Sequence, residues 1–217
     1  MTTRYLYLHG FASGPGSRKA AWFGLRLAAQ GASLEVPDLN AGDFPHLTLT
    51  RQLAVVEAVL GDDEGPVVVI GSSFGGYLAT LLAERDPRIT RLILLAPAFG
   101  FSELLRQVFG AATMVRWRAD GRLQLPSEVD SEQRWLHYDL IEDLDHHVAT
   151  GFSRQLPARL FHGIDDATVP YARSVEYLRQ NRTAQLLLLP DGHSLDDSLE
   201  VVWTQIALFL GLDTIIA

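Results

Sequence analysis

The stretch VVVIGSSFGGYLATLLA, residues 67–83, contains no charged residue and decides how the rest of the chain is interpreted. A membrane-spanning helix needs about 20 mostly apolar residues in a row. Here two serines and three glycines interrupt the apolar run, and Gly65 and Pro66 precede it. The stretch therefore predicts a buried strand, a sharp turn and then a helix.

Along the whole chain, short apolar runs alternate with longer segments of mixed polarity, a pattern typical of βαβ units. The short runs are apolar almost throughout, as parallel strands buried on both faces must be. We predict strands at residues 5–8, 33–36, 66–70, 89–95, 159–162 and 185–189. We predict helices at residues 17–30, 47–60, 75–84, 170–181 and 195–210. The predicted fold class is α/β, with a doubly wound and mostly parallel sheet.

Three residues are expected to mark the starts of these helices. Pro170 should occupy the first helical position of its helix, and Ser194 or Asp196 should cap the last one.

Residues 97–156 break the alternation and are rich in aromatic and charged side chains. In RWRADGRLQL, residues 116–125, the pair Asp120 and Gly121 between alternating residues predicts a tight hairpin turn. No repeat, low-complexity tract or flexible linker is present. We therefore expect a single domain, 1–217, in which 97–156 is a small cap or lid insertion.

Composition limits the possible partners. The chain has 217 residues, 47% of them hydrophobic, and a formal net charge of -8 at pH 7. Nucleic acids and anionic membranes attract basic patches, so neither is expected as a partner. Cysteine is absent, which excludes disulfides and thiol nucleophiles. The apolar stretch Tyr5–Leu8 is too short for a signal-peptide core, so a cytoplasmic protein is expected.

The turn after the first quoted strand carries a candidate nucleophile. Residues 71–75, GSSFG, fit the pattern G-x-S-x-G between a buried strand and a helix, the context of a nucleophile elbow. The reactive residue of that pattern is Ser73. A serine hydroxyl needs a histidine base and a carboxylate that orients it, and in this fold class they follow in the order Ser, Asp or Glu, His.

Candidates for these partners follow two later predicted strands. Asp165 and Asp166 come after the strand 159–162, and His193 comes after the strand 185–189. Ligands of open α/β sheets bind at the carboxyl ends of the strands, where all these residues fall. The residues alone leave the choice between Asp165 and Asp166 open.

The reaction also needs backbone N–H donors for an oxyanion. Phe74 follows the nucleophile and supplies the first candidate, and Phe11 after His9 and Gly10 supplies the second.

Four motifs, YLHGFASGPGSRKA, GSSFGGYLAT, HGIDDATVP and DGHS, together resemble the α/β-hydrolase superfamily, in particular the small YqiA-like bacterial esterases. The resemblance implies Ser73 as nucleophile, His193 as general base and acid, and Phe11 and Phe74 as oxyanion-hole donors. It implies Asp166 as the orienting carboxylate, because relatives commonly show H-G-x-x-D-x-x-V-P.

These features favour a serine esterase that cleaves a small carboxylic ester through an acyl-enzyme intermediate and needs no cofactor. The expected partner is a small-molecule ester, and the sequence leaves the oligomeric state open. Two alternatives remain: a thioesterase or amidase using the same triad, and a non-catalytic member of the fold that binds a ligand or partner.

Aromatic residues of the predicted cap could line an acyl pocket or form the cap's own core. If they line a pocket, a cap of this length should favour short acyl chains. These residues are Phe99, Phe101, Phe109, Trp117, Trp135 and Tyr138.

Two further patterns have weak chemical meaning. EDLDHH, residues 142–147, has two adjacent histidines, but neighbouring side chains on a helix point about 100° apart and chelate poorly, so no metal site is predicted. Gly14 and Gly16 followed by Asp38 fit a dinucleotide motif only in part, because Lys19 stands where glycine or alanine is needed.

Overall fold

The computed structural model describes residues 2–125, 134–147 and 152–213. Contacts divide the chain into two compact units. The first comprises Met1–Pro37, Asp62–Phe99 and Thr150–Ala217, and the second comprises Asp38–Gly61 and Gly100–Ala149. The second unit thus contains Asp38–Gly61 in addition to most of the segment predicted as a cap. The single-domain organisation and the role of 97–156 as a cap or lid stay predictions.

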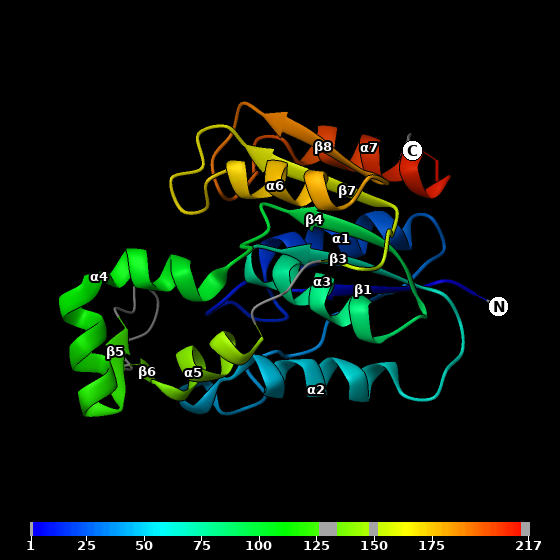
Figure 1. The fold of residues 1–217 in the computed structure, drawn as a ribbon. Helices are drawn as coiled ribbons and strands as arrows, with labels where there is room; N and C mark the ends of the chain where they lie inside the picture. Colours follow the sequence, from blue (N-terminus) through cyan, green and yellow to red (C-terminus); the bar gives the residue numbers. More distant parts are fainter. Residues whose placement is uncertain (1, 126–133, 148–151, 214–217) are drawn as a thin grey trace. The chain divides into compact units, whose positions relative to one another are not determined.

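Six strands of the described residues form one sheet in the first unit, in the order β2-β1-β3-β4-β7-β8 (Figure 1). Every neighbouring pair in this sheet is parallel. This confirms the predicted fold class, and each predicted strand is present with ends shifted by at most about two residues. The strands are β1 (Arg4–Leu8), β2 (Leu34–Glu35), β3 (Val67–Ser72), β4 (Ile89–Leu95), β7 (Ala158–Gly163) and β8 (Ala184–Leu189).

Helices of the first unit lie on both faces of this sheet. From β1 the chain crosses to β2 in one direction, and from β3 to β4 and from β7 to β8 it crosses in the other. Because such crossovers are right-handed, helix α1 lies on one face and helices α3 and α6 on the opposite face. The helices are α1 (Arg18–Ala28), α3 (Phe74–Arg85), α6 (Ala172–Gln180) and α7 (Leu199–Leu210).

The face covered by α1 and α7 holds a continuous hydrophobic core. Phe23 of α1 and Trp203 of α7 are both buried and belong to one cluster with Tyr7, Ile70 and Ile93 of the sheet. Burying a large apolar side chain contributes about 1.5–3 kcal/mol, so these helices owe their stability to packing on the strands.

Two predicted helix starts are wrong by a few residues. Helix α6 begins at Ala172 with Tyr171 as its N-cap, so Pro170 precedes the helix. Helix α7 begins at Leu199 with Ser198 as its N-cap, so neither Ser194 nor Asp196 caps it. The cause lies in the chain before α7, where the Asp191 carboxylate accepts the N–H groups of Asp197 and Ser198 and Leu195 has φ 55°. Because of this turn, α7 begins at Leu199 and not at Leu195.

The connection from β3 to α3 is unusually tight. Ser73 has φ 54° and ψ −118°, a backbone conformation that non-glycine residues rarely adopt. A Cβ atom at Gly71 would lie 2.5 Å from the carbonyl oxygen of Gly75, and one at Gly75 would overlap the carbonyl oxygen of Leu8. Only glycine therefore allows α3 to approach β3 and β1 this closely.

The described residues of the second unit form one strand pair and several helices. Residues Asp120 and Gly121 do not form the predicted hairpin turn: Asp120 is the last residue of α4, and Gly121 is its left-handed C-cap with φ 73°. An Asp-Gly pair suits both roles, because glycine after a helix is as common as glycine in a hairpin. The elements are η1 (Phe44–His46), α2 (Leu49–Leu60), α4 (Phe101–Asp120), β5 (Arg122–Leu125), β6 (Arg134–His137) and α5 (Asp139–His146). Strands β5 and β6 pair in antiparallel fashion.

Trp117 is the centre of a small aromatic cluster in the second unit. Its side chain is fully buried, and its Nε1–H donates to the carbonyl oxygen of Leu136 over 2.9 Å. The rings of Phe109 and Tyr138 contact it edge to face, at centroid distances of 5.5 and 5.6 Å. These three aromatic residues of the predicted cap thus pack on one another. Phe99, by contrast, belongs to the first unit and stacks on Tyr177.

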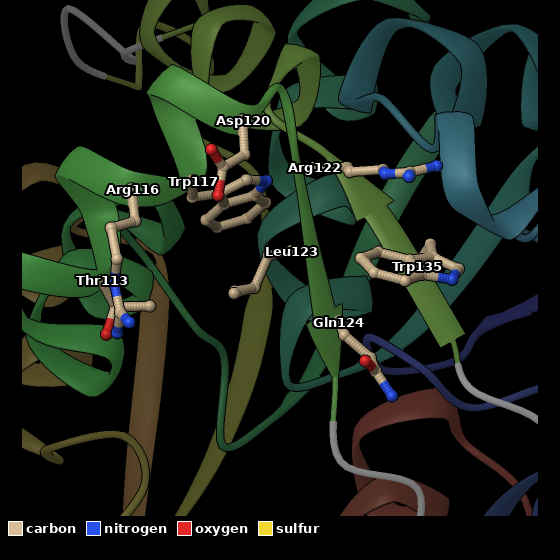
Figure 2. A pocket seen from close by; sticks show the side chains of 8 residues that line it. All are labelled: Thr113, Arg116, Trp117, Asp120, Arg122, Leu123, Gln124 and Trp135. Carbon is tan, nitrogen blue, oxygen red and sulfur yellow. The ribbon is translucent and has the colours of Figure 1, made fainter.

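A hollow of about 220 Å³ lies beside this cluster. Figure 2 shows that helix α4 and strands β5 and β6 supply its walls. None of the residues proposed for catalysis lines it. Its lining residues are Thr113, Arg116, Trp117, Asp120, Arg122, Leu123, Gln124 and Trp135.

Among the described helices, none is both long enough and apolar enough to span a membrane.

We expect Gly75→Ala to destabilise the protein by about 1–3 kcal/mol, because the new methyl group would collide with backbone that cannot move aside. Gly24→Ala in helix α1 is the matched control, since nothing lies within 4 Å of its added methyl group. In a helix interior that change should stabilise the protein by up to about 1 kcal/mol. Urea unfolding of the two variants measures both effects, and equal midpoints would contradict the close approach.

Candidate active site

Three residues from three loops form a chain of hydrogen bonds in the first unit. Ser73 follows β3, Asp166 follows β7 and His193 follows β8, so all three lie at the carboxyl edge of the sheet. The Nε2 atom of His193 lies 3.0 Å from Ser73 Oγ, and its Nδ1 atom lies 2.7 Å from Asp166 Oδ2. The structure thus brings together the serine, histidine and carboxylate that the motifs singled out.

The contacts of His193 determine where its ring carries hydrogen. An ionised carboxylate only accepts hydrogen bonds, so Nδ1, which faces Asp166, must be the protonated nitrogen. In the neutral ring Nε2 then holds a lone pair toward Ser73 Oγ, and the serine hydroxyl donates to it. This arrangement can take the serine proton, which is what a general base must do.

The Asp166 carboxylate is fully buried, and several donors surround it. Its Oδ1 accepts the backbone N–H groups of Thr168 and Val169, both over 2.8 Å. Its Oδ2 contacts the rings of His193 and His162, at 2.7 and 3.1 Å. Burial raises the pKa of Asp166, but the hydrogen bonds from both histidines and from Val169 outweigh it and hold the pKa well below its ordinary value.

Asp165, the competing candidate, takes a different position. It is exposed, and its backbone N–H donates to the carbonyl oxygen of Asp191 over 3.1 Å. A Cβ atom at Gly163 would overlap the carbonyl oxygens of Asp191 and Gly192. The loop that carries Asp165 and Asp166 is therefore pressed directly against the loop that carries His193.

The two proposed oxyanion donors are neighbours in the first unit. Phe74 is the first residue of α3 and directly follows Ser73. A Cβ atom at Gly10 would lie 3.5 Å from Ser73 Cβ, so the loop after β1 passes beside the serine. The rings of Phe11 and Phe74 meet edge to face at a centroid distance of 6.4 Å. Phe74 and the loop that carries Phe11 therefore both lie beside Ser73.

Sequence reasoning missed the residues that support the His193 loop. Lys19 is half-buried and its Nζ donates to the carbonyl oxygen of Ser194 over 2.9 Å. Burial lowers the pKa of Lys19, and Asp196 and Asp191 oppose that shift. The signal for Lys19 was its place as the single lysine of the chain, within the motif YLHGFASGPGSRKA. The signal for Asp191 was its place in the motif DGHS, two residues before His193.

Within the described ranges no group of three or more His, Asp or Glu side chains has the arrangement of a metal site. Two residues of the EDLDHH segment instead contact Thr50 in the second unit. Asp143 accepts the N–H and hydroxyl of Thr50 over 2.8 and 2.6 Å, and His147 Nε2 lies 2.7 Å from the same hydroxyl. Asp143 therefore stabilises the first turn of helix α2.

The parallel sheet, with the Ser73 turn between β3 and α3, defines the chain as a member of the α/β-hydrolase superfamily. The chain belongs to the Uncharacterised protein family (UPF0227), whose model matches residues 4–210.

Among curated proteins, the chain is similar to the mouse palmitoyl-protein thioesterase ABHD10, a mitochondrial protein. The two are 29% identical over 140 residues, which make up 62% of this chain and 47% of the relative. The aligned region thus spans about half the length of that relative.

Solved structures agree on the fold. The structure of the mouse alpha/beta hydrolase domain-containing protein 10 matches with a TM-score of 0.80 at 23% identity, covering 96% of this chain and 90% of that one. Est1E from Butyrivibrio proteoclasticus, solved with ferulic acid bound, matches with a TM-score of 0.76 at 24% identity, covering 96% of this chain and 88% of that one. At these identities the similarity establishes the fold.

We expect Asp166→Asn to lower stability at pH 7 by about 2 kcal/mol, because it leaves buried donors without their charged acceptor. The folded-state pKa of Asp166 lies below its unfolded value of about 3.9. Its contribution is therefore full above pH 4 and is lost as pH falls below that value. The difference in the free energy of unfolding between wild type and Asp166→Asn should therefore shrink below about pH 4.

Asp165→Asn is the control for this experiment. Because the Asp165 side chain is exposed, this substitution should alter the free energy of unfolding by no more than about 0.5 kcal/mol at every pH. Urea unfolding of the three proteins at pH 7, 5 and 3.5 gives the comparison. A gap between wild type and Asp166→Asn that widens toward pH 3.5 would contradict the assignment.

Proposed function

We propose that this chain is a serine hydrolase that cleaves a small carboxylic ester through an acyl-enzyme intermediate. The observation that supports the proposal is the continuous hydrogen-bond chain from Ser73 Oγ through His193 to the buried Asp166 carboxylate. A serine hydroxyl in such a chain has the base it needs to act as a nucleophile near neutral pH.

In the first half-reaction, Ser73 Oγ attacks the ester carbonyl carbon while its proton passes to Nε2 of His193. The carbonyl oxygen becomes an oxyanion, for which we propose the backbone N–H groups of Phe11 and Phe74 as donors. The intermediate then collapses, the bond to the leaving alkoxide breaks, and the Nε2 proton goes to that oxygen. The products are a free alcohol and Ser73 esterified by the acyl group.

In the second half-reaction, water takes the place of the alcohol. His193 Nε2 accepts one water proton as the water oxygen attacks the acyl carbon, and it returns this proton to Ser73 Oγ when the ester bond breaks. The acid leaves and the enzyme is restored. Asp166 holds the Nδ1–H of His193 throughout, so that Nε2 always faces the reacting atoms.

A second candidate function is the hydrolysis of thioesters by the same route. The observation that favours it is the name of the curated relatives, which are called palmitoyl-protein thioesterases. The two functions differ only in the leaving group, an alcohol or a thiol. A non-catalytic binding role, in contrast, would leave the hydrogen-bonded Ser73 without a reaction.

We expect Ser73→Ala to abolish both ester turnover and labelling by a fluorophosphonate probe, because the attacking oxygen is gone. Ser72→Ala is the control: it removes the neighbouring hydroxyl and should keep labelling, provided that the variant is folded. Gel fluorescence after labelling and circular dichroism give both readouts. Labelling that persists in Ser73→Ala, or is lost only in Ser72→Ala, would transfer the nucleophile to another residue.

We expect Asp166→Asn to lower kcat by about 10⁴, the cost of losing the orienting carboxylate in a serine protease triad. The amide leaves His193 in the wrong tautomer. Asp165→Asn should change kcat little, since its side chain is exposed. Steady-state kinetics on one ester decides between them, and the reverse ranking would make Asp165 the orienting group.

We expect a preference for short acyl chains, which rests on the modest length of the predicted cap. Each methylene group that the pocket buries improves the binding free energy by about 0.8 kcal/mol. We therefore expect kcat/KM to rise with acyl-chain length and to fall once the pocket is full. Nitrophenyl esters and the matching thioesters, with acyl chains of roughly two to sixteen carbons, give the measurement. An optimum at sixteen carbons would contradict the small pocket, and faster thioester cleavage at every length would favour the second function.

A further inference from the structure

We propose that His162 is a positioning residue for the catalytic pair, a second imidazole that shares Asp166 Oδ2 with His193. The inference rests on the proposed function and extends it to a residue outside the triad. His162 lies on β7, four residues before Asp166, and its side chain is fully buried.

The contacts of His162 fix its tautomer. Its Nε2 atom lies 3.1 Å from Asp166 Oδ2 and 2.9 Å from the carbonyl oxygen of Val169. Both partners only accept hydrogen bonds, so Nε2 must carry the hydrogen and donate to them. The ring therefore cannot act as an acceptor on the side of the carboxylate.

The other nitrogen of the ring faces a hydroxyl. Nδ1 lies 2.8 Å from Oγ of Ser174, a buried residue of α6. A hydroxyl can donate to Nδ1 while Nε2–H donates to Asp166, which satisfies both nitrogens of a neutral imidazole. A neutral ring leaves the negative charge of Asp166 available to His193.

This contact completes the shell of donors around the carboxylate. Oδ1 is held by the backbone N–H groups of Thr168 and Val169, and Oδ2 is held by two rings. With donors on both oxygens, the carboxylate cannot rotate about its own bond. Without His162, Oδ1 would keep its two backbone donors, but the position of Oδ2 would depend on His193, the residue that it has to orient.

His162 also limits how strongly Asp166 attracts the proton of His193. Two N–H groups on one oxygen share its negative charge, so each bond is weaker than a single one would be. Removing His162 concentrates that charge on His193 and stabilises its protonated ring. His193 would then lose its proton at a higher pH than in the wild type. The acid limb of the plot of kcat/KM against pH would therefore shift to higher pH.

Other charged groups near His193 do not change between the variants used below. Lys19 of α1 is held by the carbonyl oxygen of Ser194, and Asp191 accepts the N–H groups of Gly192, Asp197 and Ser198. Ser73 is the neutral partner of Nε2. A shift of the profile in a His162 variant would therefore report the bond to Asp166.

The experiment compares His162→Leu, which removes the donor, with His162→Gln, whose side-chain amide retains an N–H at a similar reach. We expect His162→Leu to lower kcat about tenfold with little change in KM, since outer partners of an oriented histidine typically contribute about 10–100-fold in metal sites. The acid limb should move to higher pH. His162→Gln should restore both quantities toward wild type.

A role in folding alone would give a different result. It would lower the amount of active enzyme without moving the pH profile, and Gln would then rescue no better than Leu; either finding overturns the proposal. If His162→Leu does not fold, Ser174→Ala replaces it: this change removes the donor to Nδ1 outside the triad and should move the profile in the same direction. An unmoved profile in folded Ser174→Ala would also overturn the proposal.

The titration of the His193 ring, followed by NMR, separates this inference from the proposed function. It needs no substrate, so it can be measured even if the wild-type chain cleaves no ester or thioester. A higher midpoint in His162→Leu than in wild type supports the shared carboxylate in either case. Equal midpoints overturn it, whether or not Ser73 proves to be the nucleophile.

Discussion

The close approach of backbone to backbone at Gly71 and Gly75 is the constraint on which the rest of the structure depends. It allows α3 to start immediately after β3, with its first turn against the carbonyl oxygen of Leu8 on β1. Ser73 then has no room for a relaxed conformation and takes φ 54°. The strain of about 1–3 kcal/mol is offset by the packing of a helix in which nine of the twelve residues are buried.

The parallel sheet brings the other residues of the site to Ser73. Since β1, β3, β7 and β8 run in the same direction, the loops after them meet at one edge. Residues far apart in sequence, Ser73 and His193, come within 3.0 Å there although 120 positions separate them. The glycine at 163 lets the two later loops touch, so the distance from Asp166 to His193 is set by backbone contacts as well as by the hydrogen bond.

The sequence predicted the strands, which share one hydrophobic pattern. It failed where the same residues are typical of two different local structures. Apolar runs identified every strand of the main sheet. In β3 the reason is burial on both faces, which leaves no room for charged residues, whereas the edge strands β2 and β8 are partly exposed and still contain apolar residues. The pair Asp120 and Gly121 was misread because a hairpin and a helix end both favour it. His162 was seen only as part of a motif, since its contact with Asp166 depends on the fold of a loop. Periodicity also gave no sign that Asp38–Gly61 belongs to the second unit.

The surroundings of Asp166 also bear on how the proposed catalytic proton moves. Burial alone would raise the pKa of this carboxyl and let it take the Nδ1 proton of His193 during the reaction. The donors on its two oxygens act against burial and hold the pKa well below the ordinary value instead. A carboxylate with so little affinity for a proton leaves that proton on His193. In the proposed reaction Asp166 would therefore stabilise the charged imidazolium as an ion, while a single proton moves between Ser73, His193 and the leaving group.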